Sequence, residues 1–142
     1  MKTDRFAICA ALVLVTSFFS SAQGATAAGL SGQWVGNSQV EGRKAIAKAT
    51  LTLGEADSDG TTLRIEDANT CTLRKGKYSA DGDGRWSVSF GEASGGEGCK
   101  RLAAGTFALR RGDNPRQVYL EASYHDADGA TALRHAALNR YP

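Results

Sequence analysis

The chain has 142 residues, with 17 basic and 15 acidic side chains, and its formal net charge at pH 7 is only +2. A chain this close to neutral lacks the dense positive charge that drives binding to nucleic acid. Its length suits a single domain, so a second independent core is not expected.

Residues 1–22 have the pattern of a secretory signal peptide. A positively charged start precedes the apolar stretch 6–15, and small residues follow it. This apolar run is too short to span a bilayer comfortably. We expect cleavage after Ala22, with Ala27 as the alternative, and a mature domain of residues 23–142 that is periplasmic or secreted and has no stable membrane insertion.

The mature chain opens with Gly32-Gln33-Trp34, preceded by Leu30. This Gly-x-Trp motif resembles the opening of lipocalins and avidins, which belong to the calycin group of small barrels. The resemblance covers this motif and the number of strands. It implies that Trp34 plugs one end of a barrel and that a basic residue near the end of the chain, Arg140 or Arg134, packs over its ring. Such a cation–π contact contributes about 0.5 to 2 kcal/mol.

Strand-type alternation dominates the rest of the chain. Apolar and polar side chains alternate from Lys44 to Leu53, as expected of a β-strand with one buried face. Asp-Gly turn signals, which favour hairpins, separate the successive runs. Similar alternation occurs at 63–65, 71–73, 86–90, 107–109 and 118–122, and the turn signals lie at 57–60, 81–84 and 126–129.

We therefore predict an all-β fold, a single small antiparallel up-and-down barrel or sandwich of about eight strands. Trp86 is expected to be a structural residue of its core, like Trp34. Residues 130–140 fit either a strand or a short helix. We favour a strand, because the first strand of an up-and-down sheet then gains a partner.

Residues 55–66 have the carboxylate spacing of an EF-hand calcium loop, with Glu in place of Asp at its first position. Alternation leads into and out of this segment, which would carry Glu66 away along a strand. We expect a solvated hairpin turn. The alternative is a calcium loop formed by Glu55, Asp57, Asp59 and Glu66.

Cys71 and Cys99 are the two cysteines left after removal of the signal peptide. An even count in an exported chain predicts one disulfide, which would contribute about 3 to 4 kcal/mol by restricting the unfolded chain. Two buried free thiols or half of a metal site are the alternatives. Neither cysteine has a paired-cysteine motif or a histidine cluster beside it.

The segment 91–101 is unusually polar and rich in glycine, and we expect no strand there. It is either a flexible connector or a binding loop that Cys99 anchors to the scaffold. Basic residues on both sides of the predicted disulfide would suit an acidic partner. The candidate partner-binding residues are Arg74, Lys75, Lys77, Glu92, Ser94, Glu97, Lys100 and Arg101.

Catalytic motifs are not visible: His125 and His135 lie apart in sequence, and most acidic residues fall in turns. We predict a protein that is not an enzyme, uses no cofactor, and binds a protein partner in the cell envelope. An inhibitor of a lysozyme-type enzyme or a toxin-immunity protein would have this format. The alternative is a small-ligand carrier of the lipocalin or avidin type, whose cavity needs an apolar and aromatic lining.

Overall fold

The computed structural model describes residues 29–142, so the expected signal peptide and both expected cleavage positions lie outside the described residues. The described chain forms short strands and one short helix. In chain order they are β1 (Gly32–Val40), β2 (Ile46–Leu53), β3 (Thr61–Glu66), β4 (Thr70–Ala80), β5 (Arg85–Ser89), β6 (Glu92–Ser94), α2 (Glu97–Ala103), β7 (Thr106–Arg111), β8 (Gln117–His125) and β9 (Thr131–Arg140).

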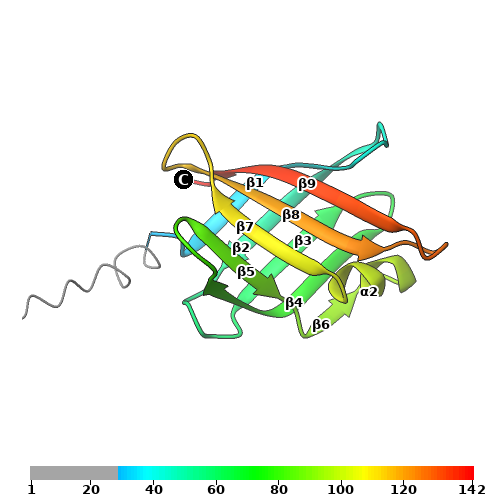
Figure 1. Ribbon diagram of the computed structural model, residues 1–142, viewed down its shortest axis with the longest axis horizontal. Helices are drawn as coiled ribbons and strands as arrows, with labels where there is room; N and C mark the ends of the chain where they lie inside the picture. The colour runs from blue at the N-terminus through cyan, green and yellow to red at the C-terminus, as the bar shows by residue number, and fades with distance from the viewer. Residues whose placement is uncertain (1–28) are drawn as a thin grey trace, which may run out of the picture.

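Eight of the strands close into an antiparallel barrel in the order β1, β2, β3, β4, β5, β7, β8, β9, and β9 pairs back onto β1 (Figure 1). Trp34 of β1, for example, lies opposite Leu51 of β2 and Arg140 of β9. The predicted all-β fold is confirmed, and of its two forms the barrel is correct. Residues 131–140 form a strand, as favoured, because β1 needs this partner on its second edge.

The extra strand, β6, arises because β4 changes partner along its length. Thr72 of β4 pairs with Ser94 of β6, whereas Tyr78 pairs with Val88 of β5. Between these two stretches the register of β4 against β3 shifts, and Lys75 adopts a positive φ of 52°. This irregularity has the character of a β-bulge, which bends the bulged strand. It separates the part of β4 that pairs with β5 from the part that pairs with β6.

Side chains of the barrel itself fill the interior. Trp34, Tyr78 and Trp86 are buried, and so are the inward leucines of β2, β3, β4, β7 and β9. An enclosed void near Ser38, Phe107 and Arg134 measures about 10 Å³. A void of this size holds one water molecule at most. Residues 29–142 therefore form a barrel with a compact core, and this interior void is far too small for a ligand.

The two ends of the barrel differ. At the Trp34 end, Arg140 lies over the indole ring, with its guanidinium carbon 5.0 Å from the ring centroid. The indole Nε1–H donates to the carbonyl of Leu30 at 2.9 Å, and Leu30 is itself fully buried. These contacts close that end. The opposite end, called here the α2 end, carries α2 and the β1–β2, β3–β4 and β8–β9 connections (Figure 1).

Candidate functional site

The 91–101 segment is ordered, unlike the strand-free connector or loop expected from its composition. Residues 92–94 form β6, and α2 begins at Glu97. Between them, Gly95 runs so close to the start of β4 that a Cβ there would lie 2.5 Å from the Thr70 carbonyl oxygen. Leu102 of α2 is buried in the core. The expectation of no strand in this segment was wrong, because contacts with β4 and the core, which are distant in sequence, order this polar segment.

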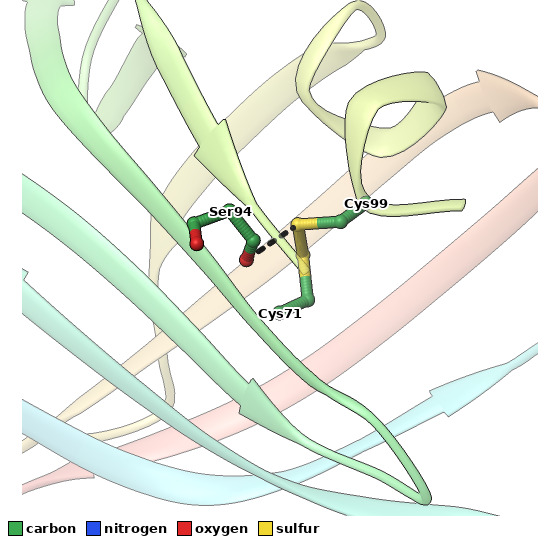
Figure 2. The surroundings of a disulfide bond; sticks show 3 residues. All are labelled: Cys71, Ser94 and Cys99. Atoms are coloured by element: carbon green, nitrogen blue, oxygen red, sulfur yellow. Dashed lines mark hydrogen bonds between the residues drawn. A yellow bond between two sulfur atoms is a disulfide. The ribbon is translucent and has the colours of Figure 1, made fainter. Parts of the chain in front are cut away.

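The predicted disulfide is present and holds α2 against β4. Cys71 of β4 and Cys99 of α2 are bonded, with their Cα atoms 5.4 Å apart, within the usual range for a disulfide. Cys99 Sγ lies 3.4 Å from the Ser94 carbonyl oxygen. Figure 2 draws this contact beside the disulfide. The bond thus joins the end of β6, the start of β4 and α2 into one unit at the α2 end.

The predicted partner-binding residues fall into two groups. Arg74, Lys75 and Lys77 lie exposed on the outer face of β4. Arg74 pairs with Glu92 of β6, near Ser94, whereas Lys77 lies beyond the bulge and pairs with Ser89 of β5. Glu97, Lys100 and Arg101 belong to α2 at the barrel end. We call the first group the β4–β6 wall.

Acidic residues reduce the positive charge of both groups without cancelling it. Lys75 Nζ lies 3.5 Å from Glu92 Oε2 on the β4–β6 wall, and Lys100 Nζ lies 3.3 Å from Glu97 Oε1 on α2. Exposed ion pairs of this kind contribute about 0 to 1 kcal/mol, so they can exchange for contacts with a partner. Basic side chains remain in excess over acidic ones on both groups.

A cleft at the α2 end was not expected from the sequence. It has a volume of about 480 Å³ and lies between α2 and the β1–β2, β3–β4 and β8–β9 connections. Three arginines from separate elements line it: Arg43 from the β1–β2 connection, Arg101 from α2, and Arg134 from β9. Only Arg101 was among the predicted partner-binding residues.

Arg134 occupies an inward position of the barrel wall. Its pairing partners are Val40 on β1 and Ala122 on β8, both buried. The guanidinium Nη1 donates to Ser38 Oγ at 2.7 Å, and Ser38 is 1% exposed. The Nε atom is buried and has no hydrogen-bond partner among residues 29–142. The alternation of β9, with Ala136 and Leu138 inward, could have placed Arg134 inside the barrel from sequence alone.

The acidic residues that line the cleft are held by other contacts. Asp126 Oδ1 accepts the backbone N–H groups of Asp128 at 2.9 Å and Ala130 at 3.0 Å. Asp67 Oδ1 accepts the N–H of Ala68, and Glu97 pairs with Lys100. In the part of the chain that the structure describes, none of these carboxylates forms an ion pair with Arg134.

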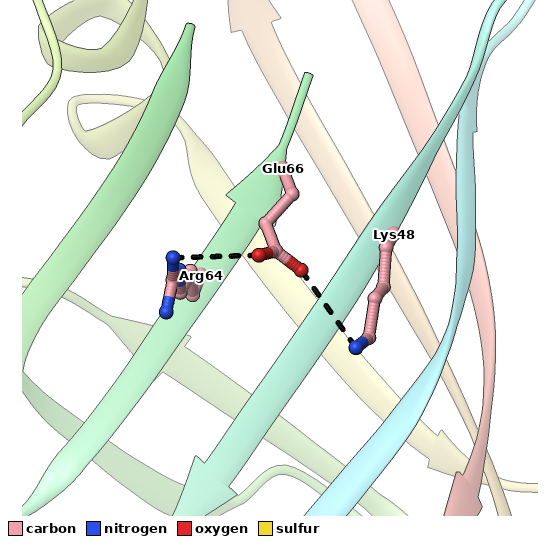
Figure 3. Close-up of polar contacts among 3 residues, drawn as sticks. All are labelled: Lys48, Arg64 and Glu66. Atoms are coloured by element: carbon pink, nitrogen blue, oxygen red, sulfur yellow. Dashed lines mark ion pairs between the residues drawn. The ribbon is translucent and has the colours of Figure 1, made fainter.

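The possible calcium loop does not form. The 54–60 connection is a hairpin turn in which the Ser58 hydroxyl donates to the Glu55 carbonyl at 2.6 Å. Glu66 lies at the far end of β3, roughly 16 Å along the strand at the usual rise per residue. There it forms ion pairs with Lys48, Nζ to Oε2 3.8 Å, and Arg64, Nη2 to Oε1 3.3 Å (Figure 3). Within residues 29–142, no group of three histidine, cysteine or acidic side chains could hold a metal ion.

A second hollow lies on the outer face of β1, β8 and β9, and His135 and Tyr119 line it. The His135 ring nitrogens lie 3.7 Å from a Glu41 carboxylate oxygen and 3.6 Å from one of Glu121. Tyr119 Oη donates to Asp113 Oδ2 at 3.0 Å, and this hydrogen bond raises the pKa of Tyr119 above its usual value. The groups in these contacts are exposed to water, so the hollow lacks the desolvated setting that catalytic groups generally need.

No protein-family model matches the sequence, and no match was found among curated proteins. The likeness to lipocalins and avidins therefore depends on two features, the Gly-x-Trp motif and the barrel. Among residues 29–142, no helix is both long enough and apolar enough to cross a membrane.

Proposed function

We propose that the protein is an exported, non-catalytic binding module that acts on a protein partner in the cell envelope. An inhibitor of a lysozyme-type enzyme or a toxin-immunity protein would act in this way. The observation that carries the proposal is the filled barrel, whose enclosed void is about 10 Å³. Binding then has to use the outer surface and the barrel end, where a protein finds more contact area than a small molecule.

The disulfide supports the proposed periplasmic or secreted location, because such bonds persist in oxidising compartments and are rare in the cytosol. It also supports a binding role for the α2 end. A segment already held in place loses less conformational entropy when it binds. The covalent link at Cys99 and the close approach of Gly95 to β4 both hold the 91–101 segment in this way.

We infer that the partner meets the β4–β6 wall together with α2. Basic side chains outnumber acidic ones there, on a protein that is nearly neutral as a whole. Charge of this kind steers an acidic partner and raises its association rate in a salt-dependent way.

A small-ligand carrier of the lipocalin or avidin type remains the second candidate. Arg140 over Trp34 matches what the Gly-x-Trp resemblance implies and supports a calycin-like relationship. The interior gives the carrier role little support, because ligand pockets usually measure about 300 to 1,000 Å³. The cleft at the α2 end, at about 480 Å³, is large enough for a small molecule.

Capture from envelope extract separates the two candidates. Immobilised mature protein is compared with Lys77→Glu, on the β4–β6 wall, and with Arg116→Glu, a matched reversal near the Trp34 end. We expect wild type and Arg116→Glu to retain the same protein and Lys77→Glu to retain less of it, most clearly at low salt. A ligand found by thermal-shift screening, with no protein retained by wild type, would favour the carrier instead.

A further inference from the structure

Arg134 has an unsatisfied charge in an unusual place. Burying a charged group is unfavourable unless hydrogen bonds or an opposite charge compensate it. The guanidinium carries five N–H donors, of which Nη1 meets Ser38 Oγ while the buried Nε–H meets no acceptor among residues 29–142. No carboxylate in that range pairs with it. The side chain therefore retains donors and positive charge for a group that comes from outside the chain.

The position of Arg134 defines where that group would enter. Arg134 lines both the cleft at the α2 end and the enclosed void beneath it. The void measures about 10 Å³, so nothing larger than a water molecule fits below the guanidinium. An occupant of the cleft would therefore place only its terminal group on Arg134 and keep the rest of its body at the rim.

Three arginines and three acidic residues line the cleft, and the acidic residues have local contacts. Arg43 and Arg101 line the cleft without an ion pair in the described part of the chain. The acidic residues Asp67 and Asp126 accept local backbone N–H groups, and Glu97 pairs with Lys100. Among anions, a carboxylate matches the planar donor fork of a guanidinium in shape and hydrogen bonding.

We propose that this cleft is a carboxylate-binding site anchored by Arg134, and that the carboxylate is an acidic side chain of the protein partner. The inference rests on the proposed protein-binding function. A partner fits better than a free small acid because the rim consists of four separate segments, which a protein contacts around the carboxylate that it places on Arg134. The disulfide fixes α2, and thus Arg101, at that rim.

The test is a titration of the ¹⁵N-labelled, disulfide-intact mature protein, followed at the Arg134 Nε–Hε resonance. The probes are the capped peptide acetyl-Gly-Gly-Glu-Gly-Gly-amide, its Gln counterpart, and acetate. We expect a saturable shift with the Glu peptide and none with the Gln peptide. Acetate should bind at least about tenfold more weakly, because it makes no rim contacts.

An unmoved Arg134 resonance, or equal shifts with the Glu and Gln peptides, would overturn the site. Acetate binding as tightly as the Glu peptide would overturn the partner side chain as the source of the carboxylate. These readouts use the wild-type protein, so they stand even if a variant fails to fold.

Variants extend the test. Arg134→Lys keeps the charge but loses the donor fork, and it should weaken binding of the Glu peptide about tenfold or more. Arg101→Gln should weaken it less, and Arg116→Gln, near the Trp34 end, should leave it unchanged. Equal peptide binding by folded Arg134→Lys and wild type would contradict the role of Arg134.

The same variants distinguish failure of the inference from failure of the proposed function. If wild type and folded Arg134→Lys retain the same protein equally from envelope extract, the carboxylate site is wrong and the binding function stands. If wild type retains no protein, the function fails whatever the peptide titration shows.

Discussion

Arg140 at the end of β9 lies over the indole ring of Trp34 on β1, with its guanidinium carbon 5.0 Å from the ring centroid. The same guanidinium donates to the carbonyl oxygens of Gly29, at 2.9 Å, and Ser31. One side chain thus ties the last strand, the first strand and the segment before it together. The contact closes the Trp34 end of the barrel.

Removing this side chain should destabilise the barrel. Arg140→Ala loses the cation–π contact and two hydrogen bonds, and we expect the free energy of unfolding to fall by about 1 to 3 kcal/mol. Urea unfolding followed by tryptophan fluorescence measures it. Arg116→Ala, an exposed arginine near the same end, is the control and should change the value by less than about 0.5 kcal/mol. Equal effects of the two substitutions would show that the contact contributes nothing.

Loss of the disulfide should destabilise the fold through the unfolded state. Changing both Cys71 and Cys99 to Ser should lower the free energy of unfolding by about 3 to 4 kcal/mol. Hydrogen exchange should accelerate most in α2 and β6, because the bond joins α2 to β4 there. Two thiols titrating in the unreduced mature protein would contradict the bond itself.

Gly95 and Gly96 make a matched pair for testing how the 91–101 segment is ordered. Both have positive φ, 140° and 95°, so an alanine at either position is strained. A Cβ at Gly95 would also lie 2.5 Å from the Thr70 carbonyl oxygen, whereas one at Gly96 meets nothing within 4 Å. Gly95→Ala should therefore cost at least about 1 kcal/mol more than Gly96→Ala. Equal thermal midpoints would mean that the close contact with β4 is not required.

Tyr119 should titrate above its usual pKa because its hydroxyl donates to Asp113 and ionisation would place a phenolate beside that carboxylate. Asp113→Asn should lower the pKa of Tyr119. Arg110 lies over the ring at 4.6 Å and lowers the pKa, so Arg110→Gln should raise it further. NMR titration of the Tyr119 Cζ resonance measures both shifts.

The raised pKa of Tyr119 also makes the stability of the protein depend on pH. The pKa of Tyr119 is higher in the folded protein than in the unfolded chain. The contribution of Tyr119 to the free energy of unfolding is therefore fully present below the unfolded pKa of about 10. It is lost as the pH rises through the folded pKa. Wild type should therefore lose more stability than Asp113→Asn across that alkaline range. A pKa of Tyr119 that is the same in both proteins would contradict the hydrogen bond.

The strands were predictable because each depends on local alternation. The run from Lys44 to Leu53 contains β2, and even Ile46, which interrupts the apolar and polar pattern, points outward and is 63% exposed. The pairing of Cys71 with Cys99 was predictable because these are the two cysteines that remain after the expected signal cleavage. Neither prediction needed knowledge of contacts between distant segments.

The α2 end was not predictable in the same way. The order of β6 and α2 depends on Gly95 lying against Thr70 and on the disulfide, both contacts between residues distant in sequence. Arg134 was considered only as a partner for Trp34, a position that Arg140 occupies. The cleft itself combines four separate segments, and sequence periodicity carries no information on how such segments meet.

Site-specific photo-crosslinking in the native host tests the binding function most directly. Glu97, exposed on α2, and Arg116, near the Trp34 end, are each replaced by a photoreactive phenylalanine analogue. We expect one discrete protein adduct from position 97 and none from position 116. No adduct from position 97, or the same adduct from both positions, would contradict a protein-binding surface at the α2 end.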